Sequence, residues 1–234
     1  IMHMFTVVII GLAMGTTVRI ARAIGAGDRE NAARTIGNTF TLFTIVAIIT
    51  TAILLAANKG IVNLIDTPQE AVKGTIDYLR ICFIGIPFII AYNIIASIFR
   101  GLGDSKSPMY FVIVACVVNI ALDYIFIGHF KMGATGAALG TTLSQAVSVI
   151  VAAIMIKKKS LMSITRQDLR PERRTMAGIL KTGVPISLQD GFIQIAFIAI
   201  TVIANGRGLN DAAAVGIVEK FIGLLFIVPS AMLA

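Results

Sequence analysis

Four polar side chains stand inside strongly apolar stretches of the sequence, at spacings that could bind a cation. Asn119 and Asp123 are four residues apart in one stretch, and Thr141 and Gln145 are four residues apart in the next. A four-residue spacing puts two side chains on one face of an α-helix. Carboxylate, amide and hydroxyl oxygens suit hard cations, and a carboxylate in apolar surroundings can instead carry a proton. These residue types predict a site for Na⁺ or H⁺ formed by the four side chains together.

Whether the four residues meet depends on how the two stretches pair. The chain turns near 129–136, which predicts an antiparallel pair of helices. In such a pair, the sequence numbers of two residues at equal depth, one on each helix, always add to about the same value. This places Asp123 opposite Thr141 and Asn119 opposite Gln145. The alternative is that Asp123 reaches out to the membrane interface while Asn119 bonds between helices. A charge in the membrane interior costs about 2.5–3.5 kcal/mol on insertion scales and needs a reason, so we favour the cation site.

The elements that carry these residues are transmembrane helices. The 234 residues are 57% hydrophobic and only 14% charged, with a mean hydropathy of +0.90. Soluble domains carry about 25% charged residues. Because backbone groups in lipid must be bonded internally, and about 20 apolar residues cross the hydrocarbon core, we expect helical spans. The sequence predicts an all-α membrane protein, a bundle with about seven spans at 1–18, 39–57, 76–98, 109–128, 137–156, 184–204 and 213–234.

Basic residues give these spans an orientation. Most lysines and arginines fall in the first, third and fifth connections, at 19–38, 99–108 and 157–183, and few fall in the others. The positive-inside rule makes these three connections cytoplasmic. The basic cluster at 157–174 could also be a nucleic-acid or anionic-lipid patch, but topology determination explains it sufficiently. We expect the lipid bilayer as a partner and no nucleic acid.

The last basic connection carries a further structural expectation. Its stretch Pro171–Lys181 has apolar residues at helical spacing, including Ile179. This predicts a short amphipathic helix on the inner membrane face, with Ile179 towards lipid.

Two of the cytoplasmic connections share a pattern. Each has an arginine at a helix end, then glycines, then an aspartate: Arg22 to Asp28 in one, Arg100 to Asp104 in the other. Glycine just past a helix end can take the left-handed conformation, and the following Asp or Ser can cap the next helix. Both patterns predict tight inner-face hairpins. The glycines Gly133, Gly136 and Gly140 are expected to permit close helix packing.

With these motifs, the sequence resembles the multidrug and toxic compound extrusion (MATE) family. The order and spacing of five segments carry the resemblance: 11–28 ending in Gly-Ala-Gly-Asp, 100–109, 119–124, 133–138 and Gly183-Val184-Pro185. It implies a MATE-like two-lobe (6+6) architecture. On that basis, 1–156 would be N-lobe helices two to six without the first helix, 157–183 the cytoplasmic interlobe loop, and 184–234 the first two C-lobe helices, truncated. Both ends lie in apolar runs, so we expect about half of a longer transporter, with its other half missing from this chain.

The resemblance also implies site residues. Some members, notably archaeal ones, place an Asn and an Asp four apart on the fifth helix and a Thr on the sixth in a cation-responsive site, matching Asn119, Asp123 and Thr141. One branch has a glutamate where this chain has Ile193, so that branch's C-lobe cation site is not expected here. Three neighbouring residues could line a cavity or lie at the interface: Asp190, Gln194 and Gln189.

The implied function is secondary active transport. An antiporter of this kind would export amphipathic or cationic drugs or toxic compounds in exchange for Na⁺ or H⁺, from the plasma or inner membrane. The alternative is a flippase for lipid-linked precursors of the same superfamily. No Ser-His-Asp, HExxH or CxxC arrangement is present and His3 and His129 are isolated, so we expect neither an enzyme nor a cofactor.

Overall fold

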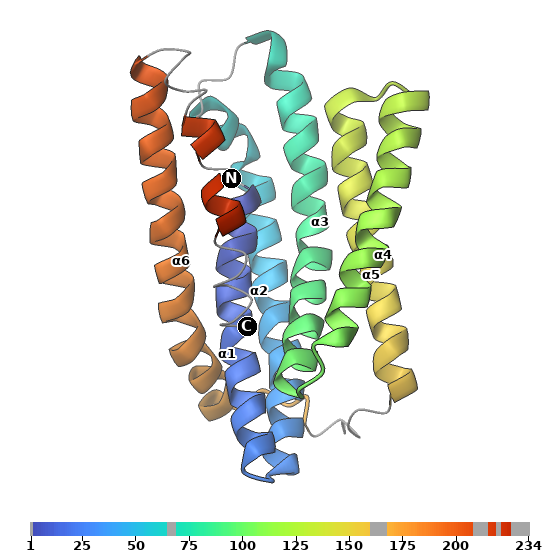
Figure 1. Cartoon of the computed structure of the whole chain (residues 1–234), viewed down its shortest axis with the longest axis vertical. Coiled ribbons are helices and arrows are strands. Elements are labelled where there is room, and N and C mark those ends of the chain that lie inside the picture. The colour runs from blue at the N-terminus through green and yellow to red at the C-terminus, as the bar shows by residue number, and fades with distance from the viewer. Residues whose placement is uncertain (1, 65–68, 160–167, 208–214, 219–220, 226–234) are drawn as a thin grey trace. The chain divides into compact units, whose positions relative to one another are not determined.

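A computed structural model describes residues 2–64, 69–159, 168–207, 215–218 and 221–225. Long helices account for nearly all of this part of the chain (Figure 1). They are α1 Met2–Gly25, α2 Arg29–Leu64, α3 Gln69–Gly101, α4 Lys106–Asp123 with the π-helix η1 Tyr124–His129, α5 Gly133–Lys159 and α6 Arg173–Arg207. The expected all-α class is therefore confirmed.

Five helical segments in the described residues are long and apolar enough to cross a membrane. They are Phe5–Gly25, Arg29–Gly60, Val72–Gly101, Lys106–His129 and Gly133–Lys158. These correspond to the first five predicted spans. The sixth predicted span, 184–204, lies within α6, and the seventh, 213–234, lies mostly outside the described residues.

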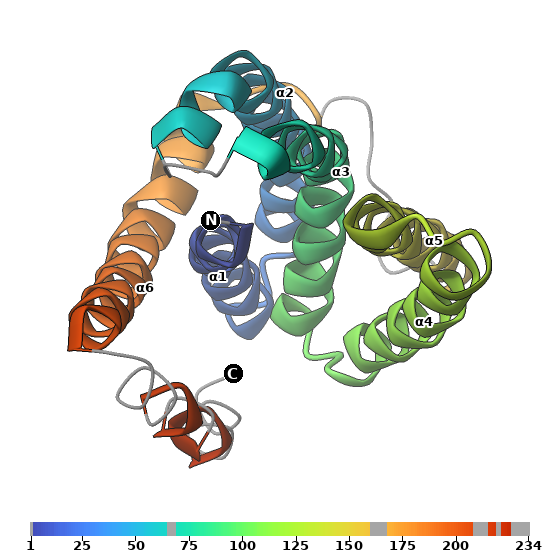
Figure 2. The same cartoon turned by 90° about the horizontal axis from the view of Figure 1, so that it is seen from above.

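Helix α3 is the centre of the α1–α5 bundle, since it packs against each of the other four helices. The view from above shows α1 and α2 on one side of α3 and the α4–α5 hairpin on the other (Figure 2). Burial follows this arrangement: 61% of the most apolar window of α3 is buried, against 6% for α4. The fully buried side chains of α3, such as Phe83 and Phe99, supply much of the packing. The outward faces of α2 and α4 remain apolar and exposed, as lipid-facing helices require.

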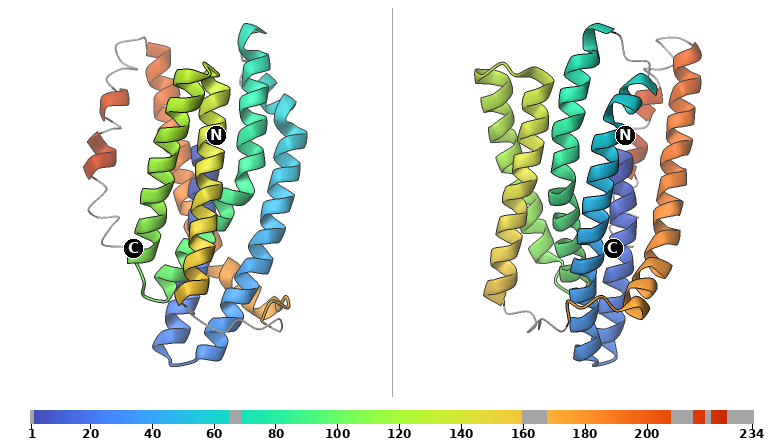
Figure 3. Two further views of the ribbon diagram at one scale, coloured as in Figure 1. Left: turned by 90° about the vertical axis from the view of Figure 1, so that its right-hand side faces the viewer. Right: turned by 180° about the vertical axis from the view of Figure 1, so that it is seen from behind.

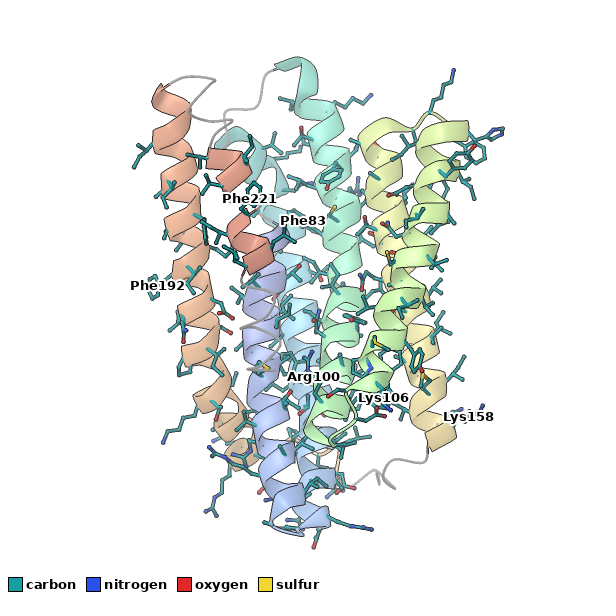
Figure 4. All side chains as sticks on the ribbon, viewed as in Figure 1. Phe83, Arg100, Lys106, Lys158, Phe192 and Phe221 are labelled. Carbon is teal, nitrogen blue, oxygen red and sulfur yellow. The ribbon has the colours of Figure 1, made fainter. Side chains whose placement is uncertain are left out.

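The helices alternate in direction, so the predicted cytoplasmic connections lie at one end of the bundle. The α1–α2 turn, the α3–α4 turn and the end of α5 are all at the lower end in Figure 1, and the side views agree (Figure 3). Arg100, Lys106 and Lys158 lie in this lower half, whereas the buried Phe83 lies above them (Figure 4). The first two basic connections and the start of the third therefore lie at one end, as predicted, while residues 160–167 of the third lie outside the described residues.

The two glycine-containing turns have one geometry. Gly27 and Gly103 both have positive φ, at 72° and 83°. In each turn the following aspartate N–H bonds back to the carbonyl five residues earlier, at 2.9 Å. Asp28 and Asp104 then accept a backbone N–H three residues further on, at 3.0 and 3.1 Å. The sequence pattern thus produces the same left-handed helix end and capped helix start at both places.

The segment before α6 is held against α2 by hydrogen bonds. The buried Asn38 accepts the N–H of Glu172 at 2.6 Å and donates to the carbonyl of Asp168 at 3.3 Å. Thr41 donates to the carbonyl of Leu169 at 2.8 Å. A side chain on Gly37 would overlap the carbonyl of Asp168. We call residues 168–172 the strap segment.

The predicted surface helix over Pro171–Lys181 is wrong. Residues from Arg173 onward form the start of α6, and Ile179 is fully buried. Ile179 packs against α1, where a side chain on Gly15 would overlap its carbonyl oxygen. Ser187 donates to the carbonyl of Val8 at 2.8 Å, further along the same pair of helices. The apolar spacing of this segment therefore serves a helix–helix contact.

The chain divides into two compact units, Ile1–Ser187 and Leu188–Ala234. The first contains α1–α5 and the first half of α6. The second contains the rest of α6 and short helical segments at 215–218 and 221–225. The lobe boundaries implied by the family resemblance stay predictions.

Candidate cation site and adjoining cavity

The antiparallel α4–α5 hairpin positions the four polar residues singled out in the sequence. Ser148 of α5 donates to the carbonyl of Phe111 of α4 at 3.0 Å, which fixes the register at the inner end. At the outer end the carboxylate of Asp123 lies against Gly140, the residue before Thr141. Asp123 therefore lies one residue from its expected partner. Both helices here are regular, so the four-residue spacings place each polar pair on one helix face.

Three of the four residues have a buried polar atom without a hydrogen-bond partner. These atoms are Asn119 Nδ2, Asp123 Oδ1 and Gln145 Oε1. The fourth residue, Thr141, donates its hydroxyl proton to the carbonyl of Ala137 at 2.9 Å. An unpaired buried polar group costs about 1–3 kcal/mol, and three of the seven such atoms in the described residues gather in this one cluster. Two of the three are oxygens: both can coordinate a cation, and the Asp123 carboxylate can also bind a proton.

Thr141 and Gln145 also line a cavity on the other side of α5. The cavity has a volume of about 290 Å³ and lies between α1, α3 and α5. Its lining is mostly apolar with a few polar groups: Thr6, Ile10, Tyr78, Cys82, Ile89, Tyr92, Asn93, Thr141 and Gln145. Asp123 and Asn119 are not among them. The structure thus divides the four residues, with the carboxylate at the α4–α5 contact and the α5 pair at the cavity.

The cavity contains residues that sequence reasoning missed. Tyr78, Cys82, Ile89 and Asn93 recur on one face of α3 at helical spacing. Asn93 is buried and donates to the carbonyl of Ile89 at 2.8 Å. The signal available in the sequence was a polar stripe in the span 76–98, which periodicity within an apolar run could have revealed.

The three possible cavity residues on α6 belong to the second compact unit. Asp190 and Gln194 are partly buried and share one face of the helix, while Gln189 is exposed. Ile193 lies on the exposed side. Their predicted role as cavity-lining residues stays a prediction.

Among the described residues, no three His, Cys, Asp or Glu side chains come together. Asp123 is the single carboxylate of the cluster, with amide and hydroxyl groups around it. This donor set suits a monovalent cation or a proton more than a transition metal, which prefers imidazole or thiolate ligands.

Comparison with known proteins identifies the family. The sequence model of the MatE family matches residues 1–125. The chain belongs to the MATE family. It is 32% identical over 212 residues to the probable multidrug resistance protein YpnP of Bacillus subtilis, covering 91% of this chain and 47% of that protein. It is also 29% identical over 219 residues to the probable multidrug resistance protein YoeA of the same organism, covering 90% of this chain and 47% of that protein.

The fold agrees with that of a solved MATE protein. The structure superposes with a TM-score of 0.81 and 31% identity on the inward-facing conformation of a multidrug resistance MATE family transporter, covering 97% of this chain and 52% of that one. The chain therefore spans about half the length of the relatives it matches. As a MATE family member with five candidate spans, it is a multi-pass membrane protein.

Proposed function

We propose that the protein works as a secondary active antiporter, in which entry of Na⁺ or H⁺ at Asp123 drives export of an amphipathic, often cationic, compound. The observation that carries the proposal is the pair of buried, unpaired oxygens Asp123 Oδ1 and Gln145 Oε1. Both belong to the α4–α5 hairpin, and Gln145 also lines the cavity. A cation or proton bound at Asp123 is therefore one helix away from a compound in the cavity.

The composition of the cavity supports an exporter of apolar or cationic compounds. Its described lining residues are two tyrosines, a cysteine, aliphatic side chains and neutral polar groups, with no lysine or arginine among them. An apolar cavity with a few polar groups admits compounds of varied shape. A flippase for polyanionic lipid precursors would need basic side chains to hold the phosphates, and the described lining of this cavity contains none. The plasma or inner membrane is the proposed location.

The test is ethidium efflux from vesicles that hold the whole protein, under imposed Na⁺ or pH gradients. Removing the charge with Asp123→Asn is expected to lower gradient-driven efflux at least tenfold, because the amide neither carries a proton nor offers a negative oxygen to Na⁺. The matched control is Asp77→Asn, since Asp77 is an exposed carboxylate on α3. Its efflux is expected to stay within twofold of wild type.

Separate gradients identify the coupling ion. Efflux that follows a Na⁺ gradient at equal pH indicates Na⁺, and efflux that follows a pH gradient without Na⁺ indicates H⁺. Unchanged gradient-driven efflux in Asp123→Asn, at equal expression, would contradict the proposed site. Transport of a lipid-linked pyrophosphate in place of ethidium would identify the flippase instead.

A further inference from the structure

Gly140 lies where a side chain would compete for space with the Asp123 carboxylate. Gly140 is buried on α5, and the nearest atoms to a side chain at this position all belong to Asp123. A Cβ built there would overlap Asp123 Oδ1 and would come within 3.4 Å of its Cγ and 3.5 Å of its backbone nitrogen. The carboxylate therefore occupies the space that any other residue at 140 would fill.

The backbone does not require glycine at this position. In the described part of the chain, the glycines with positive φ are Gly27, Gly103 and Gly133, all at turns or helix starts. Gly140 lies inside α5 with ordinary helical geometry, where alanine is the more favourable residue. Space then explains glycine at 140, and the atom nearest to this space is Asp123 Oδ1.

The neighbouring glycines of α5 and α3 make different contacts. Gly136, one turn before Gly140 on the same face, lies against apolar atoms: the Cβ atoms of Met132 and Phe126 would be 3.0 and 3.1 Å from an added Cβ. Gly85 of α3 lies against the Thr142 side chain on another face of α5. Close packing alone accounts for Gly136. It does not account for a gap filled by a carboxylate whose Oδ1 is buried and has no hydrogen-bond partner.

We propose that Gly140 is a positioning residue for the cation site: the absence of a side chain there lets the Asp123 carboxylate lie against α5 next to Thr141. This inference rests on the proposed role of Asp123. A methyl group at 140 would push the carboxylate away from α5 while leaving its charge intact. The site would then keep the charge of the carboxylate, but the carboxylate would no longer lie next to Thr141.

The experiment measures ethidium efflux as a function of the driving cation in vesicles holding the whole protein, with four variants. In Gly140→Ala, the cation concentration at half-maximal efflux is expected to rise at least tenfold, with the maximal rate within threefold of wild type. In Gly136→Ala, which crowds apolar atoms on the same helix, the cation dependence is expected to stay within twofold. Gly74→Ala, at an exposed position with no atom within 4 Å, is expected to behave as wild type.

The fourth variant, Gly140→Ala in an Asp123→Ala background, separates positioning from general packing. If the added methyl acts only through the carboxylate, this double variant should match Asp123→Ala in both efflux and thermal midpoint. Should Gly140→Ala alone fail to fold, recovery of folded protein in the double variant supports the same conclusion. A double variant that is also unfolded, or a Gly140→Ala cation dependence equal to that of Gly136→Ala, overturns the proposal.

Failure of the proposed function gives another pattern. If Asp123 is not the coupling group, Asp123→Ala itself keeps gradient-driven efflux. That result would exclude both the coupling role of Asp123 and the positioning role of Gly140. If Asp123→Ala loses efflux but Gly140→Ala has a normal cation dependence, only the positioning role is excluded.

Discussion

At the residue scale, the proposed role of Gln145 in the cation site can be separated from a structural role. Its Oε1 is buried and unpaired, and its side chain lines the 290 Å³ cavity. Asn58 differs in its amide nitrogen, which donates to the carbonyl of Ile76 at 3.1 Å and joins α2 to α3, although its Oδ1 is also buried without a hydrogen-bond partner. An amide retained for structure should cost stability when it is removed. One retained to bind a cation should cost affinity instead.

Replacing Gln145 with leucine tests this distinction at the residue scale. Gln145→Leu is expected to keep or raise the thermal midpoint, because an unpaired buried oxygen is removed. The cation concentration at half-maximal efflux should rise about tenfold, equivalent to about 1.4 kcal/mol. Asn58→Leu, the control, should lower the midpoint and leave the cation dependence unchanged. Equal cation dependence in both variants would remove Gln145 from the site.

At the scale of elements, the strap segment 168–172 joins the start of α6 to α2. Asn38 contributes two of the hydrogen bonds, and it is only 2% exposed. Because Gly37 has no side chain, the carbonyl of Asp168 can lie close to α2, within hydrogen-bond distance of Asn38. Asn38 bonds the backbone on both sides of Arg170, and Thr41 adds one bond to Leu169, so these two side chains attach this basic stretch to α2.

Cleavage by trypsin reports on this attachment. Asn38→Leu removes the hydrogen bonds to the Glu172 N–H and the Asp168 carbonyl, which should destabilise the strap segment by about 1–3 kcal/mol. Cleavage after Arg173, an exposed residue directly after the strap segment, should become roughly tenfold faster in inside-out vesicles. Thr41→Val removes only one hydrogen bond to the strap segment, the bond to the carbonyl of Leu169, and should have a smaller effect. Identical cleavage rates in Asn38→Leu and wild type would show that the strap segment is held by other contacts.

At the scale of the whole molecule, the alternating helices place the basic connections at one end of the bundle and the α4–α5 turn at the other. From the positive-inside rule we expect the basic end to be cytoplasmic. Lys158 and His129 lie at opposite ends of the α4–α5 hairpin, and both are exposed.

Cysteine labelling in intact cells tests this orientation. In a background without Cys82 and Cys116, an impermeant maleimide added outside should label His129→Cys and not Lys158→Cys. Permeabilised cells should show labelling of both. External labelling of Lys158→Cys alone would reverse the orientation and place the basic connections outside.

The sequence by itself determined the helical class, the first five spans, the grouping of basic connections and the approximate pairing of Asp123 with α5. These follow from local physics: spacing along a helix, the length needed to cross lipid and the chemistry of glycine turns are properties of short segments. Asp123 faces Gly140 instead of Thr141 because side-chain packing sets the exact register of two helices.

Only the tertiary structure decided what surrounds α5 and where α6 begins. Thr141 and Gln145 meet Tyr78 and Asn93 because α3 is parallel to α5 and central in the bundle, which no spacing within one span reveals. Ile179 was expected at the lipid surface and is buried against α1, because an apolar helix face fits a neighbouring helix as well as lipid. The identity of a helix's neighbours depends on contacts between residues far apart in the chain.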